Sequence, residues 1–263
     1  MTAASTPLTF TGAQGAPLAA RLELPADRPR ACAVFAHCFA CGKDSHAAAS
    51  RISKALTSYG IAVLRFDFTG LGQSGGDFAG TTFSSNVEDL VRAADHLREH
   101  HRAPTILIGH SLGGTAALAA AHRVPEVRAV ATIGAPAAPV HVTRLFGDYR
   151  TQLAERGQAE AHLSGRTVRV SSDFVEDLVQ QPQDQRVRSL DAALLVMHSP
   201  SDHVVAVDNA RQIFDTARHP KSYVALPHAD HLLTDRADAD YAAAVLAAWA
   251  SRYTDTPAAV ALP

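Results

Sequence analysis

The chain has 263 residues, 47% of them hydrophobic, which suits one large α/β domain with a three-layer core or two small domains. Its formal net charge of −2 gives no reason to expect a nucleic acid or an anionic membrane as partner. No stretch reaches the length of a membrane span, and residues 1–6 lack the basic start and apolar core of a secretion signal, so we expect a cytoplasmic protein.

Taken in chain order, the apolar patterns predict strands that alternate with helices. The first two strands, split by Gly12–Gly15, form an antiparallel hairpin, and Ser85 with Glu88 is typical of a helix capping box. The alternation implies a mostly parallel, eight-stranded sheet with helices on both faces. The predicted strands are 8–11, 18–24, 31–36, 61–66, 105–108, 127–133, 193–197 and 222–226, and the predicted helices are 44–59, 85–102, 113–121, 208–218 and 237–252.

One long segment, between Pro136 and Leu190, interrupts this alternation because it is charged and poor in core residues. It predicts an amphipathic helix near 142–156, a hairpin that turns at Ser164-Gly165, and a short helix over 173–180. The segment is too long for a plain connection. We therefore expect a core of residues 1–138 and 190–263, with residues 139–189 as a small inserted cap at the carboxyl edge of the sheet.

The stretch Gly109-His110-Ser111-Leu112-Gly113 has the form G-x-S-x-G, between an apolar run that predicts a buried strand and an Ala-rich run that favours a helix. A serine on such a sharp turn is forced into a strained backbone conformation, and glycines two residues to either side remove the resulting clashes. The turn projects the hydroxyl above the sheet, over the free N–H groups of the helix N-terminus. We predict that Ser111 is a catalytic nucleophile.

A nucleophilic serine needs an acid and a histidine. On folds where the serine lies on a sharp strand-to-helix turn of this kind, called a nucleophile elbow, the acid and the histidine follow it in that order along the chain. Asp202 directly follows a buried strand, whereas its rival Asp208 lies where a helix should begin and is better interpreted as an N-cap. His231 is favoured over His228 because the loop after the last strand needs several residues to swing back. These positions predict Asp202 as the orienting acid and His231 as the base.

Two backbone N–H groups should bind the oxyanion. One donor is Leu112, the residue after the nucleophile. The other should come from the loop after the third strand, where Phe39 is the natural candidate. Each donor of this kind typically stabilises the transition state by about 3 kcal/mol.

At these residues the chain resembles the serine α/β-hydrolases, and more closely the small bacterial hydrolases also found fused to an OsmC-like peroxide-reductase domain. The resemblance runs from the third strand through His231, and it implies an α/β-hydrolase fold. It supports Ser111, Asp202 and His231 as the triad, with Phe39 and Leu112 as oxyanion donors. The matching residues are HCFACGKD at 37–44, LRFDFTGLGQS at 64–74, GHSLGG at 109–114 and IGAP at 133–136. The chain departs from many such hydrolases at Cys38, where a glycine often follows the histidine.

Three further motifs need another interpretation. Gly70–Gly75 matches the dinucleotide fingerprint, but no helix opens directly after it, so we expect a tight loop beside the active site. Gly42-Lys43-Asp44 lacks the first glycine and the Ser/Thr of a phosphate loop. Cys38 and Cys41 are either packing residues, a redox pair, or half of a zinc site with only His37 and His46 nearby. In a reducing cytoplasm we expect thiols.

The sequence therefore predicts a serine hydrolase that cleaves a carboxylic ester or thioester through an acyl-enzyme, with no cofactor and no metal. The expected partner is a small-molecule acyl substrate rather than nucleic acid or membrane. The oligomeric state is left open, with a homodimer as one option. Two alternatives remain: a peptidase or amidase with the same triad, and a non-catalytic binding protein on this fold.

Overall fold

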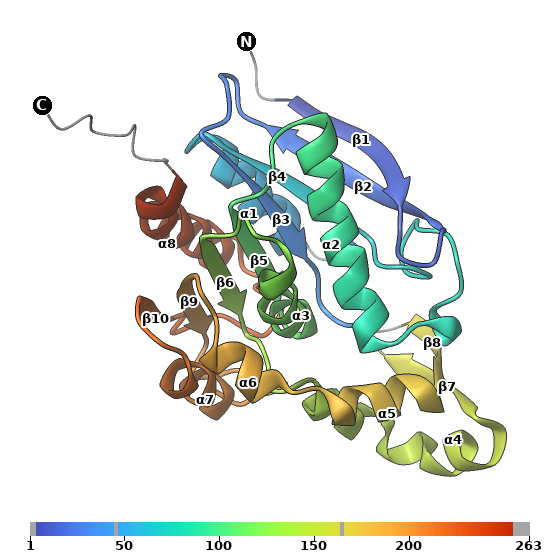
Figure 1. Cartoon of the computed structure of the whole chain (residues 1–263). Helices are drawn as coiled ribbons and strands as arrows, with labels where there is room; N and C mark the ends of the chain where they lie inside the picture. Colours follow the sequence, from blue (N-terminus) through green and yellow to red (C-terminus); the bar gives the residue numbers. More distant parts are fainter. Residues whose placement is uncertain (1–3, 45–46, 164–165, 255–263) are drawn as a thin grey trace, which may run out of the picture.

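Strands without a polar face lie at the centre of an eight-stranded sheet (Figure 1). The computed structural model describes residues 4–44, 47–163 and 166–254. The strand order is β1-β2-β4-β3-β5-β6-β9-β10, in which β2 pairs antiparallel with β1 and β4, and all other pairs are parallel. The predicted mostly parallel sheet is therefore confirmed. The strands of the sheet are β1 (Ala4–Thr11), β2 (Pro17–Leu24), β3 (Ala31–Ala36), β4 (Ile61–Phe66), β5 (Ile106–His110), β6 (Ala129–Ile133), β9 (Ala193–His198) and β10 (Lys221–Ala225).

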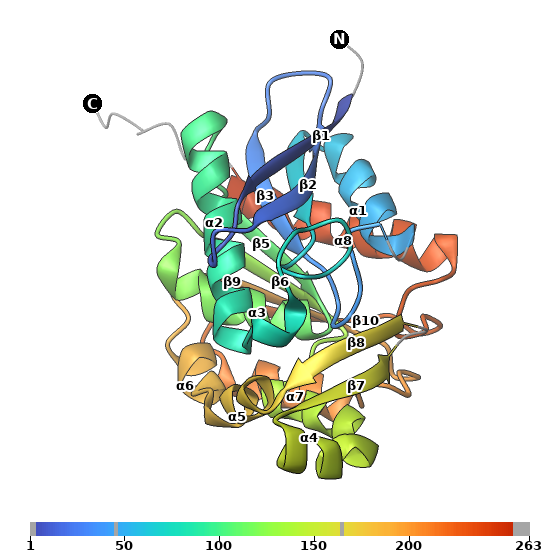
Figure 2. The same ribbon diagram turned by 90° about the vertical axis from the view of Figure 1, so that its right-hand side faces the viewer.

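Helices cover both faces of the sheet. Successive residues of a strand point to opposite faces, and in the central strands both faces are apolar and have to be buried. Ala33 and Val63 pack into the layer of α1 and α8, whereas Val34 and Leu64 pack into the layer of α2 and α3. Figure 2 shows these two pairs of helices on opposite sides of the strands. The helices in the two layers are α1 (Ala47–Thr57), α2 (Phe83–His100), α3 (Leu112–Ala120), α7 (Asp208–Thr216) and α8 (Arg236–Thr254).

Two of these helices have other N-terminal caps than those predicted. The prediction of a Ser85–Glu88 capping box is wrong, because Thr82 is the N-cap of α2. The Thr82 hydroxyl accepts from Ser85 N at 3.0 Å, and Ser85 Oγ accepts from Thr82 N at 2.9 Å. Asp208 is likewise not the N-cap of α7; Val207 occupies that position and makes no side-chain cap bond.

The segment between β6 and β9 contains the 3-10 helix η3 (Pro139–Tyr149), α4 (Arg150–Arg156), the hairpin β7 (Gln158–Leu163) and β8 (Arg166–Ser171), α5 (Ser172–Gln180) and α6 (Gln183–Arg188). Figures 1 and 2 both draw it below the sheet, with α6 beside α7. The α-helix predicted over 142–156 is wrong in its first half, where Gly147 and β-branched residues are poor helix formers.

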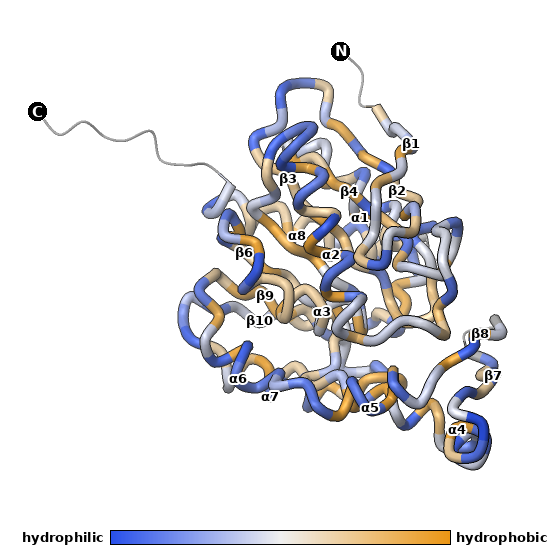
Figure 3. Tube along the Cα trace, turned by 45° about the vertical axis from the view of Figure 1, so that its right-hand side comes forward, coloured by the Kyte–Doolittle hydropathy of each residue, from blue (hydrophilic) through white to orange (hydrophobic). Residues whose placement is uncertain are grey.

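The rest of this segment follows the predicted pattern more closely. β7 and β8 pair antiparallel, while the predicted turn residues Ser164 and Gly165 lie outside the described residues. Hydrophilic and hydrophobic positions alternate along α5 in Figure 3, and its apolar side buries Phe174 and Leu178. The role of residues 139–189 as a cap remains a prediction. Nowhere in the described ranges does a helix have the length and apolar character that a membrane crossing needs.

Candidate active site

The turn between β5 and α3 is built around Ser111. Its backbone has φ 54° and ψ −129°, a positive φ that is strained for a residue with a side chain. A Cβ added at Gly109 would lie 2.2 Å from Gly113 O, and one at Gly113 would lie 2.3 Å from His37 O. Only glycine therefore fits at either position, and the sequence pattern and the observed strained turn agree.

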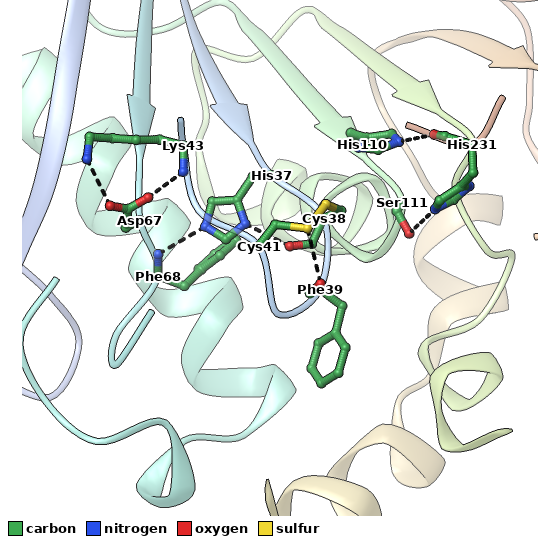
Figure 4. The surroundings of a disulfide bond; sticks show 10 residues. All are labelled: His37, Cys38, Phe39, Cys41, Lys43, Asp67, Phe68, His110, Ser111 and His231. Carbon is green, nitrogen blue, oxygen red and sulfur yellow. Dashed lines mark hydrogen bonds and ion pairs between the residues drawn. A yellow bond between two sulfur atoms is a disulfide. The ribbon is translucent and has the colours of Figure 1, made fainter. Parts of the chain in front are cut away.

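Ser111, His231 and Asp202 lie together at this turn. His231 Nε2 is 3.1 Å from Ser111 Oγ (Figure 4), and His231 Nδ1 is 2.7 Å from Asp202 Oδ2. Since an ionised carboxylate only accepts, Nδ1 carries the proton toward Asp202 and Nε2 is left to accept from the serine hydroxyl. The structure thus brings together the three residues predicted as nucleophile, base and acid, in an arrangement that can move a proton off Ser111.

The Asp202 carboxylate is buried and held from two sides. Its Oδ1 accepts hydrogen bonds from Val204 N and Val205 N, both at 2.8 Å, while Oδ2 faces His231. Burial opposes ionisation, but the hydrogen bonds from His231 and the two backbone groups outweigh it and keep the pKa of Asp202 below its ordinary value. The rivals Asp208 and His228 are both exposed, and among the described residues no hydrogen bond or ion pair joins either to Ser111 or His231.

The two predicted oxyanion donors border one small cavity. Leu112 is the first residue of α3, so its N–H has no partner within the helix, and Phe39 lies on the loop after β3. Within residues 4–44, 47–163 and 166–254, neither N–H donates a hydrogen bond. Both groups are therefore free to bind an anionic oxygen.

The loop that carries Phe39 is closed by a disulfide between Cys38 and Cys41 (Figure 4). The expectation of free thiols at these positions is wrong. Ala40 has a φ of 55°, and this left-handed turn brings the two cysteine Cα atoms to 5.5 Å, within the range for a disulfide. The bridge also removes both sulfurs as zinc ligands. Cys32 is separate, in β3, where burial raises the pKa of its thiol to about 11.

A buried network of charges lies behind the same loop, and sequence reasoning missed it. Lys43 Nζ is 2.8 Å from both Asp67 Oδ2 and Gln73 Oε1, and Lys43 N also donates to Asp67. Arg65 Nη2 donates to Glu23 Oε1 at 2.7 Å, and Arg65 Nη1 donates to the backbone oxygen of Lys43 at 2.6 Å. Buried pairs of this kind are costly to break, so the network fixes the conformation of the loop's end.

Two other features near the site have a clear structural role. His110 Nε2 lies 2.6 Å from the backbone oxygen of His231 and ties the histidine loop to the elbow (Figure 4). The variable second position of the G-x-S-x-G pattern gives no signal for this contact.

At Gly72, a Cβ would lie 2.4 Å from the Asp67 carboxyl, and α2 begins only at Phe83. The glycines of 70–75 thus form a tight loop rather than a dinucleotide site.

Comparison with known proteins places this chain among serine hydrolases. Residues 27–183 match the family described as serine aminopeptidase, S33. A crystal structure of the esterase domain of a Rhodothermus marinus protein is 46% identical, with a TM-score of 0.79 over 95% of this chain and 99% of that one. The predicted α/β-hydrolase fold is confirmed by this likeness.

Curated relatives are more distant. The human mitochondrial palmitoyl-protein thioesterase ABHD10 is 29% identical over 69% of this chain, which spans 60% of that protein's length. A monoacylglycerol lipase of Mycolicibacterium smegmatis is 26% identical over 84% of this chain and 89% of its own. The names of both relatives describe cleavage of an acyl group from sulfur or oxygen.

Proposed function

Since the chain belongs to the serine aminopeptidase S33 family, we propose that it hydrolyses carboxylic esters or thioesters through an acyl-enzyme intermediate. The observation that carries this proposal is the relay from Asp202 through His231 to Ser111, at 2.7 and 3.1 Å. Such a relay activates a hydroxyl that is otherwise a weak nucleophile at neutral pH.

In the proposed reaction, His231 Nε2 takes the proton as Ser111 Oγ attacks the carbonyl carbon, and Asp202 stabilises the imidazolium. The oxygen of the tetrahedral intermediate binds to Phe39 N–H and Leu112 N–H, each worth about 3 kcal/mol at the transition state. His231 then protonates the leaving alcohol or thiol. Water, activated by the same histidine, releases the acid from Ser111.

The relatives favour an ester or thioester over an amide. The esterase domain, the thioesterase and the lipase are all named for cleavage at oxygen or sulfur, whereas the family is named for a peptidase. A small-molecule acyl compound is the proposed substrate, and residues 139–189 are proposed as the cap that selects it. We also retain a cytoplasmic location as a proposal, although the Cys38–Cys41 disulfide is more usual in an oxidising compartment.

Covalent labelling tests the proposal. An active-site phosphonate should add once, to the peptide that contains Ser111, and Ser111→Ala should abolish both the adduct and the hydrolysis of short acyl esters. Anilides with the same acyl groups serve as the comparison. Labelling elsewhere, or no labelling of folded protein, would contradict the enzyme proposal, and faster cleavage of the anilides would favour the amidase.

A further inference from the structure

Four phenylalanine rings from separate parts of the chain pack together at the side chain of Phe39. Phe39 lies on the loop after β3, and Phe78 lies on the short 3-10 helix η1 (Phe78–Gly80). Phe146, on η3, and Phe174, on α5, belong to the predicted cap. The Phe39 ring centroid is 5.8 Å from that of Phe78. The rings of the cap are as close, with centroids 5.9 Å (Phe146) and 5.5 Å (Phe174) away. We call these four residues the aromatic cluster.

The rings of the aromatic cluster hold one another in place. Phe78 and Phe146 meet the Phe39 ring edge to face, at interplanar angles of 62° and 78°, in the geometry that aromatic pairs prefer. Phe78 and Phe174 are also in contact, with centroids 5.3 Å apart. The Phe39 ring is partly buried, and the other three are buried. Because a close-packed ring shifts only if its neighbours shift too, the predicted cap helps to fix the position of the Phe39 side chain.

Polar contacts join the predicted cap to the core beside the aromatic cluster. Asp177, on α5, accepts hydrogen bonds from Ser84 N at 2.7 Å and from Ser84 Oγ at 2.8 Å, at the start of α2. Arg169, on β8, forms an ion pair with Asp77, the residue before η1. Both contacts are exposed, and exposed pairs of this kind contribute little stability. The buried rings therefore contribute more than these pairs to holding the cap against the loop of Phe39.

The peptide group that carries the Phe39 N–H is oriented by His37. A carbonyl oxygen only accepts, so His37 Nδ1 donates to Cys38 O, at 2.7 Å, and Nε2 is left to accept from Phe68 N at 3.4 Å. Cys38 O and the Phe39 N–H belong to one planar trans peptide, in which the two groups point in opposite directions. His37 thus sets the direction of this N–H. The Phe39 ring, which points away from Ser111 in Figure 4, sets the position of the residue.

We propose that Phe146 and Phe174 are positioning residues of the oxyanion hole, which hold the Phe39 N–H in place through the Phe39 ring. An oxyanion donor has to lie about 2.7–3.1 Å from the oxygen that it stabilises. A smaller side chain at either cap position leaves space into which the Phe39 ring can move, and the backbone of the loop moves with it. The predicted cap then contributes to catalysis with every ester, in addition to selecting among them. This inference rests on the proposed ester hydrolysis at Ser111.

Two esters that differ in one atom test the inference. Ethyl butanoate gives an oxyanion in the tetrahedral intermediate, whereas the thionoester O-ethyl thiobutanoate places a sulfur there, which is a weak hydrogen-bond acceptor. Both esters release an acid, which is titrated at constant pH. The ratio of kcat/KM for the ester to that for the thionoester reports on the oxyanion donors, and it cancels the concentration of active enzyme. We expect Phe146→Leu and Phe174→Leu each to lower this ratio about fivefold, since loss of a whole donor costs about 10²- to 10³-fold in kcat and a displaced donor costs less.

Inhibition by a trifluoromethyl ketone with the same propyl chain gives a second readout. The adduct of this ketone with Ser111 carries the same oxyanion as the intermediate. Its Ki should therefore rise in both cap variants by about the factor by which the ratio falls. This readout decides where the thionoester is cleaved too slowly to be followed.

Two further variants separate donor placement from a general loss of packing. Leu246→Ala is the matched control, since Leu246 is also fully buried but lies on α8, in the hydrophobic layer on the other face of the sheet. It should lower Tm at least as much as the cap variants and leave the ratio unchanged. Phe39→Leu should lower the ratio as the cap variants do. Adding Phe146→Leu to Phe39→Leu should lower it little further, because the ring through which Phe146 acts is already gone.

The outcomes separate this inference from the proposed function. If the two cap variants fold but keep the wild-type ratio and Ki, the inference is overturned while ester hydrolysis stands. The same holds if Leu246→Ala lowers the ratio as much as they do. Where the cap variants do not fold, Phe39→Leu decides, and an unchanged ratio in it overturns the inference. If no ester is cleaved and the phosphonate leaves Ser111 unlabelled, the proposed function itself fails.

Discussion

Asp202→Asn tests the relay because the surroundings of this carboxylate permit no harmless orientation of an amide. If the Asn oxygen keeps the bonds from Val204 N and Val205 N, its NH₂ group faces His231 Nδ1. His231 must then carry its proton on Nε2, where it can no longer accept from Ser111. The reverse orientation sets the NH₂ group against two N–H donors.

The expected loss follows from that wrong tautomer. The same exchange in a known serine triad lowers turnover about 10⁴-fold, which corresponds to about 5 kcal/mol of transition-state stabilisation. Steady-state hydrolysis of a short ester at neutral pH measures it, with Asp208→Asn as the matched control. Asp208 is exposed at the start of α7, so its variant should keep at least half of the wild-type kcat/KM. A tenfold or smaller loss in Asp202→Asn would refute the reasoning, as would a large loss in Asp208→Asn.

Three further predictions concern stability, redox state and selectivity. The pKa of Asp202 is lower in the folded chain than in the unfolded one, so its ionisation stabilises the fold above about pH 4, and this contribution is lost as the pH falls through the folded pKa. The difference in Tm between wild type and Asp202→Asn should shrink between about pH 7 and pH 3; a constant difference would exclude the charge as its cause. With the Cys38–Cys41 bridge closed, alkylation of folded protein should find no reactive thiol, because Cys32 is buried with a pKa of about 11. Reduction should free two thiols and lower kcat, because the loop of Phe39 loses its cross-link. Cys41→Ser should lower kcat for the same reason. A rise in activity on reduction would instead indicate that the disulfide inhibits the enzyme. Substitutions of exposed residues in 139–189 should change relative rates among esters more than Tm, and parallel losses of both would place the segment in the core.

Two of the central strands could be predicted to the residue. The fully apolar run 31–36 and the run 61–66, apolar apart from Arg65, coincide with β3 and β4, because a buried parallel strand needs no polar face and its ends are marked by polar or glycine residues. The elbow was equally local, since the strained turn at Ser111 requires glycines at fixed positions. Chain order and the loop positions after β9 and β10 then favoured Asp202 and His231 over their rivals, and the fold brings both to Ser111.

Other features depend on contacts that a pattern of residue types does not encode. Thr82 and Ser85 are both good caps, and only tertiary packing decides where α2 begins. The disulfide depends on a positive φ at Ala40, a conformation that an alanine does not indicate. The Lys43–Asp67 pair joins residues 24 positions apart in the chain, and the small cavity bordered by Phe39 and Leu112 forms only when four separate segments pack together.

The acyl-enzyme is the most direct test of the account. Wild-type protein mixed with 4-nitrophenyl acetate and quenched in acid within the first turnover should gain the mass of one acetyl group, and peptide mapping should place it on Ser111. Asp202→Asn should form the same adduct far more slowly. Steady release of nitrophenol with no acetyl on Ser111, or with the acetyl on another residue, would contradict the proposed mechanism.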